Sequence, residues 1–196
     1  MKKLLVAICG VSLLTACGPR AFVKGDYDKD VESTNLLNDQ WSETDMQVAV
    51  KDLVNSAIAH PAIANAKRPP VVMVTKLQNK TSEHIDTQSI TDMVTAELMR
   101  GGKVSFVDKA AREDMADEYQ YQEENASRET KKAKGGQTGA DFILNGRLDS
   151  IVQEAGKDKT VYYKITLNMT NLKTGLIVWS DYKQIRKVFK KKRVGL

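Results

Sequence analysis

The chain has 196 residues, of which 41% are hydrophobic, 28% charged and 6% aromatic, which allows one compact domain with short appendages. Four prolines and 12 glycines exclude collagen-like and low-complexity architectures, and two cysteines exclude a disulfide scaffold. The net charge is +5, yet residues 183–196 carry basic residues and no acidic one, so a basic end follows an acidic body. With only two histidines, far apart, the composition favours binding over catalysis.

The N-terminus has the order of a bacterial secretory signal. Two lysines precede an apolar stretch from Leu4 to Leu14, and small residues lead to Cys17. The stretch is too short to span a bilayer. The sequence Leu-Thr-Ala-Cys is typical of a lipobox, so we expect a lipoprotein signal peptide over residues 1–16 and acylation of Cys17.

Acylation at Cys17 would anchor the protein without spanning the membrane, because each buried methylene contributes about 0.8 kcal/mol. The alternative is an ordinary signal cleaved after Ala16, which leaves a soluble periplasmic protein with a free thiol. Gly18 follows the cysteine, where an Asp would indicate retention at the inner membrane. We therefore expect an outer-membrane location, facing the periplasm.

Residues 17–41 contain the lipidated cysteine followed by a polar segment without apolar periodicity, which predicts a flexible tether. Ser42-Glu-Thr-Asp45 resembles a capping box, so a helix is expected to begin there. Apolar residues at helical spacing continue to Ile58, and His60-Pro61 ends the pattern. The globular part is expected to cover residues 42–189.

The run Val71–Val74 is continuous and apolar, which predicts the central strand of the sheet, covered on both faces. A polar loop over residues 77–84 precedes a second helix with its apolar face at Ile90, Met93, Val94 and Leu98, ending at Gly101. Residues 103–107 read as a further strand. Together these segments predict a right-handed βαβ unit.

Asp108 is a good N-cap for a third helix, and residues 127–139 are expected to add a short fourth. Residues 142–152, 161–172 and 176–189 predict three antiparallel strands, and Lys173-Thr-Gly175 predicts the second hairpin turn. Alternation with polar residues places one face of the middle strand on the core, at Tyr163, Ile165, Leu167 and Met169. The fold class is therefore α/β of the α+β type. We expect a mixed sheet of four to five strands with three to four helices, mainly on one face.

No segment has the pattern of an active site. The glycine pairs near residues 101 and 135 lack the spacing of a phosphate loop. The carboxylates of residues 113–124 are so dense on one predicted helix that they indicate a solvated face and not a catalytic pair. We expect no catalytic residue, no metal and no cofactor.

A basic tail is expected over residues 190–196. Its cluster is Lys190, Lys191, Lys192 and Arg193. The export signal excludes nucleic acid as a partner, which leaves an anionic membrane surface, peptidoglycan or another wall polymer, an acidic protein patch, or simply a solvated terminus.

Four stretches resemble the LpoB family of outer-membrane lipoproteins. Residues 72–81, VMVTKLQNKT, are similar to the family's first strand and following Asn-x-Thr loop. Residues 91–107 resemble the next helix and strand, which meet at a Gly-Lys turn. Residues 139–144, GADFIL, and 174–180, TGLIVWS, are similar to its Gly-Ala-x-Tyr strand and Thr-Gly-x-x-x-Trp-Ser hairpin.

The resemblance implies a fold like the N-terminal domain of TolB and no active site in this chain. It implies that the domain binds the regulatory domain of a bifunctional class A penicillin-binding protein and activates that enzyme allosterically in peptidoglycan synthesis. The candidate partner-binding residues are Asn79, Lys80 and Thr81, although this Asn-x-Thr loop fits a structural turn as well as a docking site.

Two alternatives remain from other classes of protein. One is a structural component of an envelope or secretion assembly, similar to TolB-related and curli-secretion lipoproteins, which the short tether and basic tail favour slightly. The other is a wall hydrolase, which needs a positioned nucleophile or acid/base pair. The sequence offers little for the second.

Overall fold

The computed structural model describes residues 30, 34, 36–132 and 134–191. All elements belong to the unit Glu32–Leu196. In chain order they are α1 (Glu43–Ala59), α2 (Pro61–Ala64), β1 (Val71–Val74), β2 (Gln78–Lys80), α3 (Thr87–Arg100), β3 (Ser105–Phe106), α4 (Arg112–Asn125), β4 (Phe142–Ala155), β5 (Asp158–Asn171) and β6 (Ile177–Lys190). The expected α+β class is confirmed, and the described residues form six strands in one mixed sheet with four helices.

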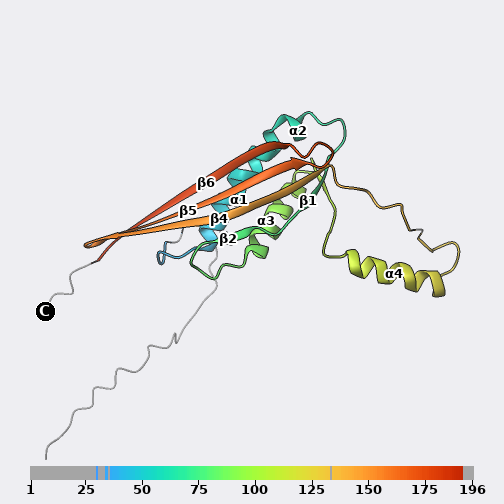
Figure 1. Ribbon diagram of the computed structural model, residues 1–196, viewed down its shortest axis with the longest axis horizontal. Helices are drawn as coiled ribbons and strands as arrows, with labels where there is room; N and C mark the ends of the chain where they lie inside the picture. The colour runs from blue at the N-terminus through green and yellow to red at the C-terminus, as the bar shows by residue number, and fades with distance from the viewer. Residues whose placement is uncertain (1–29, 31–33, 35, 133, 192–196) are drawn as a thin grey trace, which may run out of the picture. The chain divides into compact units, whose positions relative to one another are not determined.

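The strands lie in the order β3-β1-β4-β5-β6, with β2 also paired to β4 (Figure 1). The pairs β1–β3, β1–β4 and β2–β4 are parallel, whereas β4–β5 and β5–β6 are antiparallel. The expectation of β1 as the central strand is wrong, because β4 occupies the middle of this order. Only Val71 and Val72 of β1 are buried. The apolar run of four residues reflects this burial, but it carries no information on where the strand lies in the sheet.

The expected polar loop over residues 77–84 contains the short strand β2. Val74 pairs with Leu144, and Gln78 pairs with Arg147, so β2 continues along β4 after one extra residue on its own side. Its three residues are polar and at most half-buried, and no local pattern marks them as a strand.

The first helix begins as expected. The Ser42 hydroxyl accepts a hydrogen bond from the Asp45 amide, and the Asp45 carboxylate accepts one from the Ser42 amide at 2.8 Å. This reciprocal pair satisfies two amides that a helix start leaves open. The buried face of α3 includes Ile90, Val94 and Leu98, and α1 and α3 bury their apolar faces in one core with the sheet.

The segment between β3 and β4 differs from expectation. Asp108 accepts hydrogen bonds from the amides of Ala110 and Ala111, which forms a turn, and α4 begins only at Arg112. No residue of α4 is buried. The short helix expected over residues 127–139 is absent from the described part of that segment, which forms turns and irregular chain. Glycines at 135, 136 and 139 disfavour a helix there.

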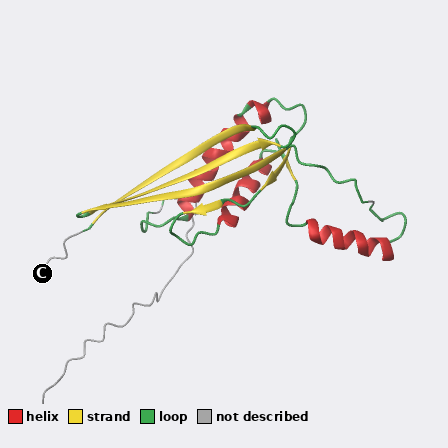
Figure 2. Ribbon diagram, in the orientation of Figure 1, coloured by secondary structure: helices red, strands yellow, loops and turns green. Residues whose placement is uncertain are grey.

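The last three strands are long and regular. Tyr163, Ile165, Leu167 and Met169 alternate with half-buried residues, as expected for a sheet with one covered face. Gly175, with φ of 71°, lies in the expected second turn. Figure 2 shows the ends of β4, β5 and β6 reaching past the helices, and Lys190, expected in the basic tail, is the last residue of β6.

Candidate functional site

The chain segment that enters α1 is fixed to the sheet by a group of residues that we call the entry cluster: Asp39, Trp41, Glu83, Tyr163 and Lys187. These residues come from the segment before α1, the loop after β2, and strands β5 and β6. Residues 39–41 fall within the expected tether, and the structure attaches this last part of it to the domain.

Tyr163 lies at the centre of the cluster and is 1% exposed. Its hydroxyl donates to a carboxylate oxygen of Glu83 and lies 3.1 Å from the carbonyl oxygen of Asp39. Trp41 packs edge-on against its ring, with the centroids 5.4 Å apart. Burial, followed by the hydrogen bond to Glu83, raises the pKa of the Tyr163 hydroxyl well above its ordinary value of 10.0. The neutral tyrosine therefore acts as a hydrogen-bond donor.

Glu83 connects the loop after β2 to the entering segment. One carboxylate oxygen accepts from Tyr163, and the other accepts from the amide of Trp41 at 3.0 Å. The loop that presents Glu83 is closed by Asn79, whose amide donates to the Glu83 carbonyl at 2.9 Å, and by Thr81, whose hydroxyl accepts from the Glu83 amide at 3.1 Å. The Asn-x-Thr sequence thus positions the glutamate.

Lys187 is a buried cation with a buried partner. Its ammonium lies 2.6 Å from a carboxylate oxygen of Asp45, donates to the Gln40 carbonyl, and stands 5.8 Å from the centre of the Tyr163 ring. The side chains of Lys187 and Asp45 are 4% and 8% exposed. Removing only one partner of such a buried pair is strongly destabilising, because the other charge then stays buried without a partner. It ties the end of β6 to the first turn of α1.

Further polar contacts between α1 and β6 extend this attachment. Lys183 is paired with Asp52, and the Ser56 hydroxyl donates to Asp181 at 2.5 Å and accepts from the Trp179 indole at 3.3 Å. Together with the pair of Lys187 and Asp45, these contacts lie along α1. The two ion pairs neutralise Lys183 and Lys187, which are two of the cations in the basic end of the sequence.

Asp39 is held by a second lysine on the sheet. The Lys159 ammonium lies 2.5 Å from the Asp39 carboxylate. This hydrogen bond lowers the pKa of Asp39 below its ordinary value of 3.8 and raises the pKa of Lys159 above 10.5. Charged groups therefore hold the entering segment to the sheet at two neighbouring residues, Asp39 through Lys159 and Gln40 through Lys187.

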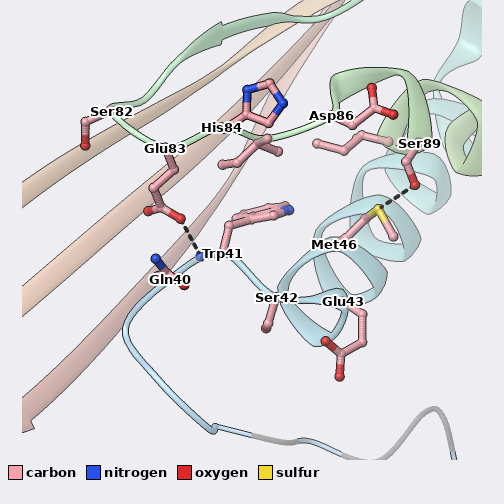
Figure 3. A pocket seen from close by; sticks show the side chains of 12 residues that line it. Gln40, Trp41, Ser42, Glu43, Met46, Ser82, Glu83, His84, Asp86 and Ser89 are labelled. Carbon is pink, nitrogen blue, oxygen red and sulfur yellow. Dashed lines mark hydrogen bonds between the residues drawn. The ribbon is translucent and has the colours of Figure 1, made fainter. Parts of the chain in front are cut away.

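An open hollow of about 670 Å³ lies beside the entry cluster. Figure 3 shows Trp41 between the loop of Glu83 and His84 on one side and the start of α1, with Met46, on the other. The Ser89 hydroxyl lies 3.9 Å from the Met46 sulfur.

The described residues contain no group of three or more His, Cys, Asp or Glu side chains that could hold a metal ion. None of their helices is long and apolar enough to cross a membrane.

The structure separates the candidate residues of the sequence. Asn79 and Thr81 hydrogen-bond within their loop, whereas Lys80 between them is exposed. Partner binding by these three residues stays a prediction. In the basic tail, Lys190 ends β6, and the Lys191 amide donates to the Lys157 carbonyl at 2.8 Å. Cys17, Lys192, Arg193 and the expected signal over residues 1–16 lie outside the described residues.

Sequence reasoning missed the entry cluster, although part of its geometry has a local signal. Asp45 and Asp52 are seven residues apart on a helix and therefore share a face, and Lys183 and Lys187 are four apart on a strand and share a face. Charges on an otherwise apolar face indicate a partner on the facing element. Tyr163, Glu83 and Asp39 have no such signal, because they are brought together only by the fold.

Several solved structures are similar to this chain at low sequence identity. The solved LpoB C-terminal domain from Salmonella enterica is 16% identical, with a TM-score of 0.45, over 72% of this chain and 98% of that one. The NMR structure of Escherichia coli LpoB is 13% identical, with a TM-score of 0.44, over 93% of this chain and 88% of that one. Lipoprotein GNA1162 from Neisseria meningitidis is 13% identical, with a TM-score of 0.41, over 61% and 84%. No curated protein matches the chain.

The family assignment depends on a match of another kind. The model of the family described as "Peptidoglycan-synthase activator LpoB" matches residues 45–185, which is more than two thirds of the chain. The match begins at Asp45 of the capping box and ends within β6, so it covers the whole described sheet apart from its last residues. The chain belongs to the LpoB family of peptidoglycan-synthase activators.

Proposed function

We propose that this chain is a lipoprotein of the outer membrane, acylated at Cys17 and facing the periplasm, whose domain binds and activates a class A penicillin-binding protein. Binding occurs at the regulatory domain of that enzyme, and activation follows from a higher affinity for its active state. The observation that carries the proposal is the family match over residues 45–185. The chain itself supplies no catalytic group in this scheme.

The entry cluster supports a role for the anchor in this function. A tether limits where the domain can reach, and the hydrogen bonds of Glu83 and Lys187 to Trp41 and Gln40 fix where the tether leaves the domain. The reach of the domain is therefore set by the residues before Gln40, because Gln40 and Trp41 are themselves held on the domain.

The activation is tested with the full-length chain and the organism's purified class A penicillin-binding proteins. Glycan polymerisation and peptide crosslinking are followed with and without the chain, and binding is measured by titration. We expect saturable binding and faster synthesis with one enzyme. A monofunctional transpeptidase without a regulatory domain is the control. Failure to bind any class A enzyme would overturn the proposal and favour a structural role in an envelope assembly.

The candidate docking residue Lys80 is tested in the same assay. Lys80→Ala removes an exposed side chain and leaves the hydrogen bonds of Asn79 and Thr81 intact, so folding is preserved. Weaker binding to the synthase is expected. Lys76→Ala, another exposed lysine close in the chain, is the matched control.

The anchor is tested by Cys17→Ser. Palmitate labelling and recovery in the outer-membrane fraction are both expected to disappear, while synthase activation in detergent solution is kept. The basic residues at positions 190–193 are proposed to contact an anionic membrane surface, so their replacement by glutamine is expected to lower binding of the unlipidated chain to anionic vesicles.

A further inference from the structure

One face of the long strands is not covered by the helices α1 and α3. Residues of β4, β5 and β6 alternate between two faces, and α1 and α3 bury their apolar sides against the face of Tyr163 and Leu148. On the opposite face, Ile151, Tyr162 and Arg186 lie in one row across the three strands. Gln153, Thr160 and Val188 form the next row.

These two rows surround a shallow hollow of about 700 Å³, which Gln184 completes. Adjacent strands are about 4.8 Å apart, so three strands give a surface about 10 Å across, which matches two linked sugar rings. Ile151 and Val188 are 56% and 55% exposed on either side of the half-buried Tyr162. An aromatic ring with aliphatic neighbours thus faces solvent.

Three polar side chains of the hollow are free to bind a ligand, as far as the described residues show. Within the described residues, the side chains of Gln153, Gln184 and Arg186 make no hydrogen bond or ion pair, unlike Arg147 on the same face, which pairs with Asp149 at 3.0 Å. Two amides and a guanidinium therefore point donors and acceptors at whatever occupies the hollow.

We infer that this hollow, which we call the strand platform, binds a glycan strand of N-acetylated amino sugars that carries acidic groups. The apolar C–H face of a sugar ring fits the ring of Tyr162, and the acetamido methyl groups fit Ile151 and Val188. Glutamine amides pair with acetamido amides and hydroxyls, and Arg186 pairs with carboxylates in two-point geometry. A purely apolar partner would leave these polar groups unpaired.

Charge agrees with an acidic glycan. The charged residues of this face are Arg147, Lys164, Arg186, Lys190, Asp149 and Asp158. Arg147 pairs with Asp149, and Lys190 lies opposite Asp158 in the register of β5 and β6, so the excess positive charge of this face comes from Lys164 and Arg186. The platform lies on residues other than the entry cluster and other than Lys80. The inference therefore goes beyond synthase activation.

The test uses the full-length chain with two kinds of probe: purified peptidoglycan sacculi, and soluble tetramers of N-acetylglucosamine or of glucose. Sedimentation with sacculi and NMR titration with the tetramers report binding. We expect retention on sacculi and shifts at residues 151–162 and 184–188 with the N-acetylglucosamine tetramer. The glucose tetramer, which lacks acetamido groups, is expected to bind at least about tenfold more weakly.

Matched variants separate the platform from general surface effects. Tyr162→Ala and Arg186→Gln are expected to lower sacculus binding by about tenfold each, and Arg186→Gln to affect the neutral tetramer less. Tyr182→Ala changes the same residue type on the same face outside the hollow, and is expected to bind as the unchanged chain. Tyr162→Trp keeps an aromatic ring and should keep binding even if the alanine variant folds poorly.

The other outcomes are equally definite. No binding of either sugar probe, or shifts away from the platform, would overturn the inference. If Tyr162→Ala instead weakened binding to the synthase while sugars did not bind, the platform would be a protein-docking face and the inference would again be wrong. Retained synthase activation by Tyr162→Ala, with sacculus binding about tenfold weaker, is the expected combination.

Discussion

Lys187 on β6 and Asp45 in the first turn of α1 form an ion pair of 2.6 Å that is almost closed to solvent. The same Asp45 carboxylate accepts the capping hydrogen bond from the Ser42 amide. The start of α1, the entering segment and the end of the sheet therefore share one charged centre. Removing either charge disturbs all three.

The first prediction concerns this pair. Lys187→Met leaves the buried carboxylate of Asp45 without its cation, so the free energy of unfolding should fall by about 3–5 kcal/mol. Urea unfolding followed by circular dichroism measures the change. Lys183→Met is the control, because its pair with Asp52 is much more exposed and should contribute below about 1 kcal/mol. Equal effects of the two variants would contradict the assignment of Lys187 as a buried cation.

The second prediction concerns Tyr163 at high pH. Its pKa is raised in the folded protein by burial and by Glu83, so its contribution to stability is complete below the unfolded value of 10.0 and is lost as the pH rises above it. Unfolding should become easier above pH 10 in the unchanged chain. Tyr163→Phe should lose part of this pH dependence, which denaturant unfolding between pH 8 and 11 measures.

The same variant has an effect at neutral pH. Without the hydroxyl, one oxygen of Glu83 loses its donor, and the expected loss is about 1–3 kcal/mol. Tyr162→Phe, the neighbouring residue on the opposite face, is the control and should change stability little. An identical alkaline profile for Tyr163→Phe and the unchanged chain would show that Tyr163 ionises freely.

The third prediction concerns Gly146 on β4. A Cβ atom at this position would stand 2.2 Å from the Thr166 carbonyl oxygen and 2.7 Å from Leu167, so β5 must move to admit it. Gly146→Ala should cost about 1–3 kcal/mol or prevent folding. Gly139→Ala is the matched control, because open space surrounds its Cβ and its backbone is ordinary. Thermal unfolding of the two variants compares them directly.

The sequence predicted those elements whose signal is local. The capping box at Ser42, the helical spacing of Ile90, Val94 and Leu98, and the alternation from Tyr163 to Met169 each lie within one element, and each is confirmed. The strand β2 and the place of β1 beside β4 depend on pairing with distant residues. No local pattern contains that information.

The entry cluster was missed for the same reason. Tyr163 had a place in the predicted core, but Glu83 and Asp39 join it from parts of the chain that read as polar loop and tether. Polar residues in such segments are usually solvated, so their composition favoured that interpretation. Only the packed structure shows that the buried hydroxyl needs them as acceptors.

The last prediction concerns the charge that holds the entering segment. The hydrogen bond from Lys159 lowers the pKa of Asp39, so the contribution of this pair is present above the ordinary value of 3.8 and is lost as the pH falls through the lower folded value. Lys159→Gln removes the cation and should move the pKa of Asp39 back toward 3.8. Carbon-detected NMR titration of the Asp39 carboxyl between pH 2 and 6 measures the shift, with Lys157→Gln as the control beside it.

The segment should also be cleaved more readily by protease near residue 39 in Lys159→Gln, because one of its attachments to the sheet is gone. An unchanged pKa with unchanged cleavage would mean that Asp39 is held by its backbone hydrogen bond to Tyr163 alone.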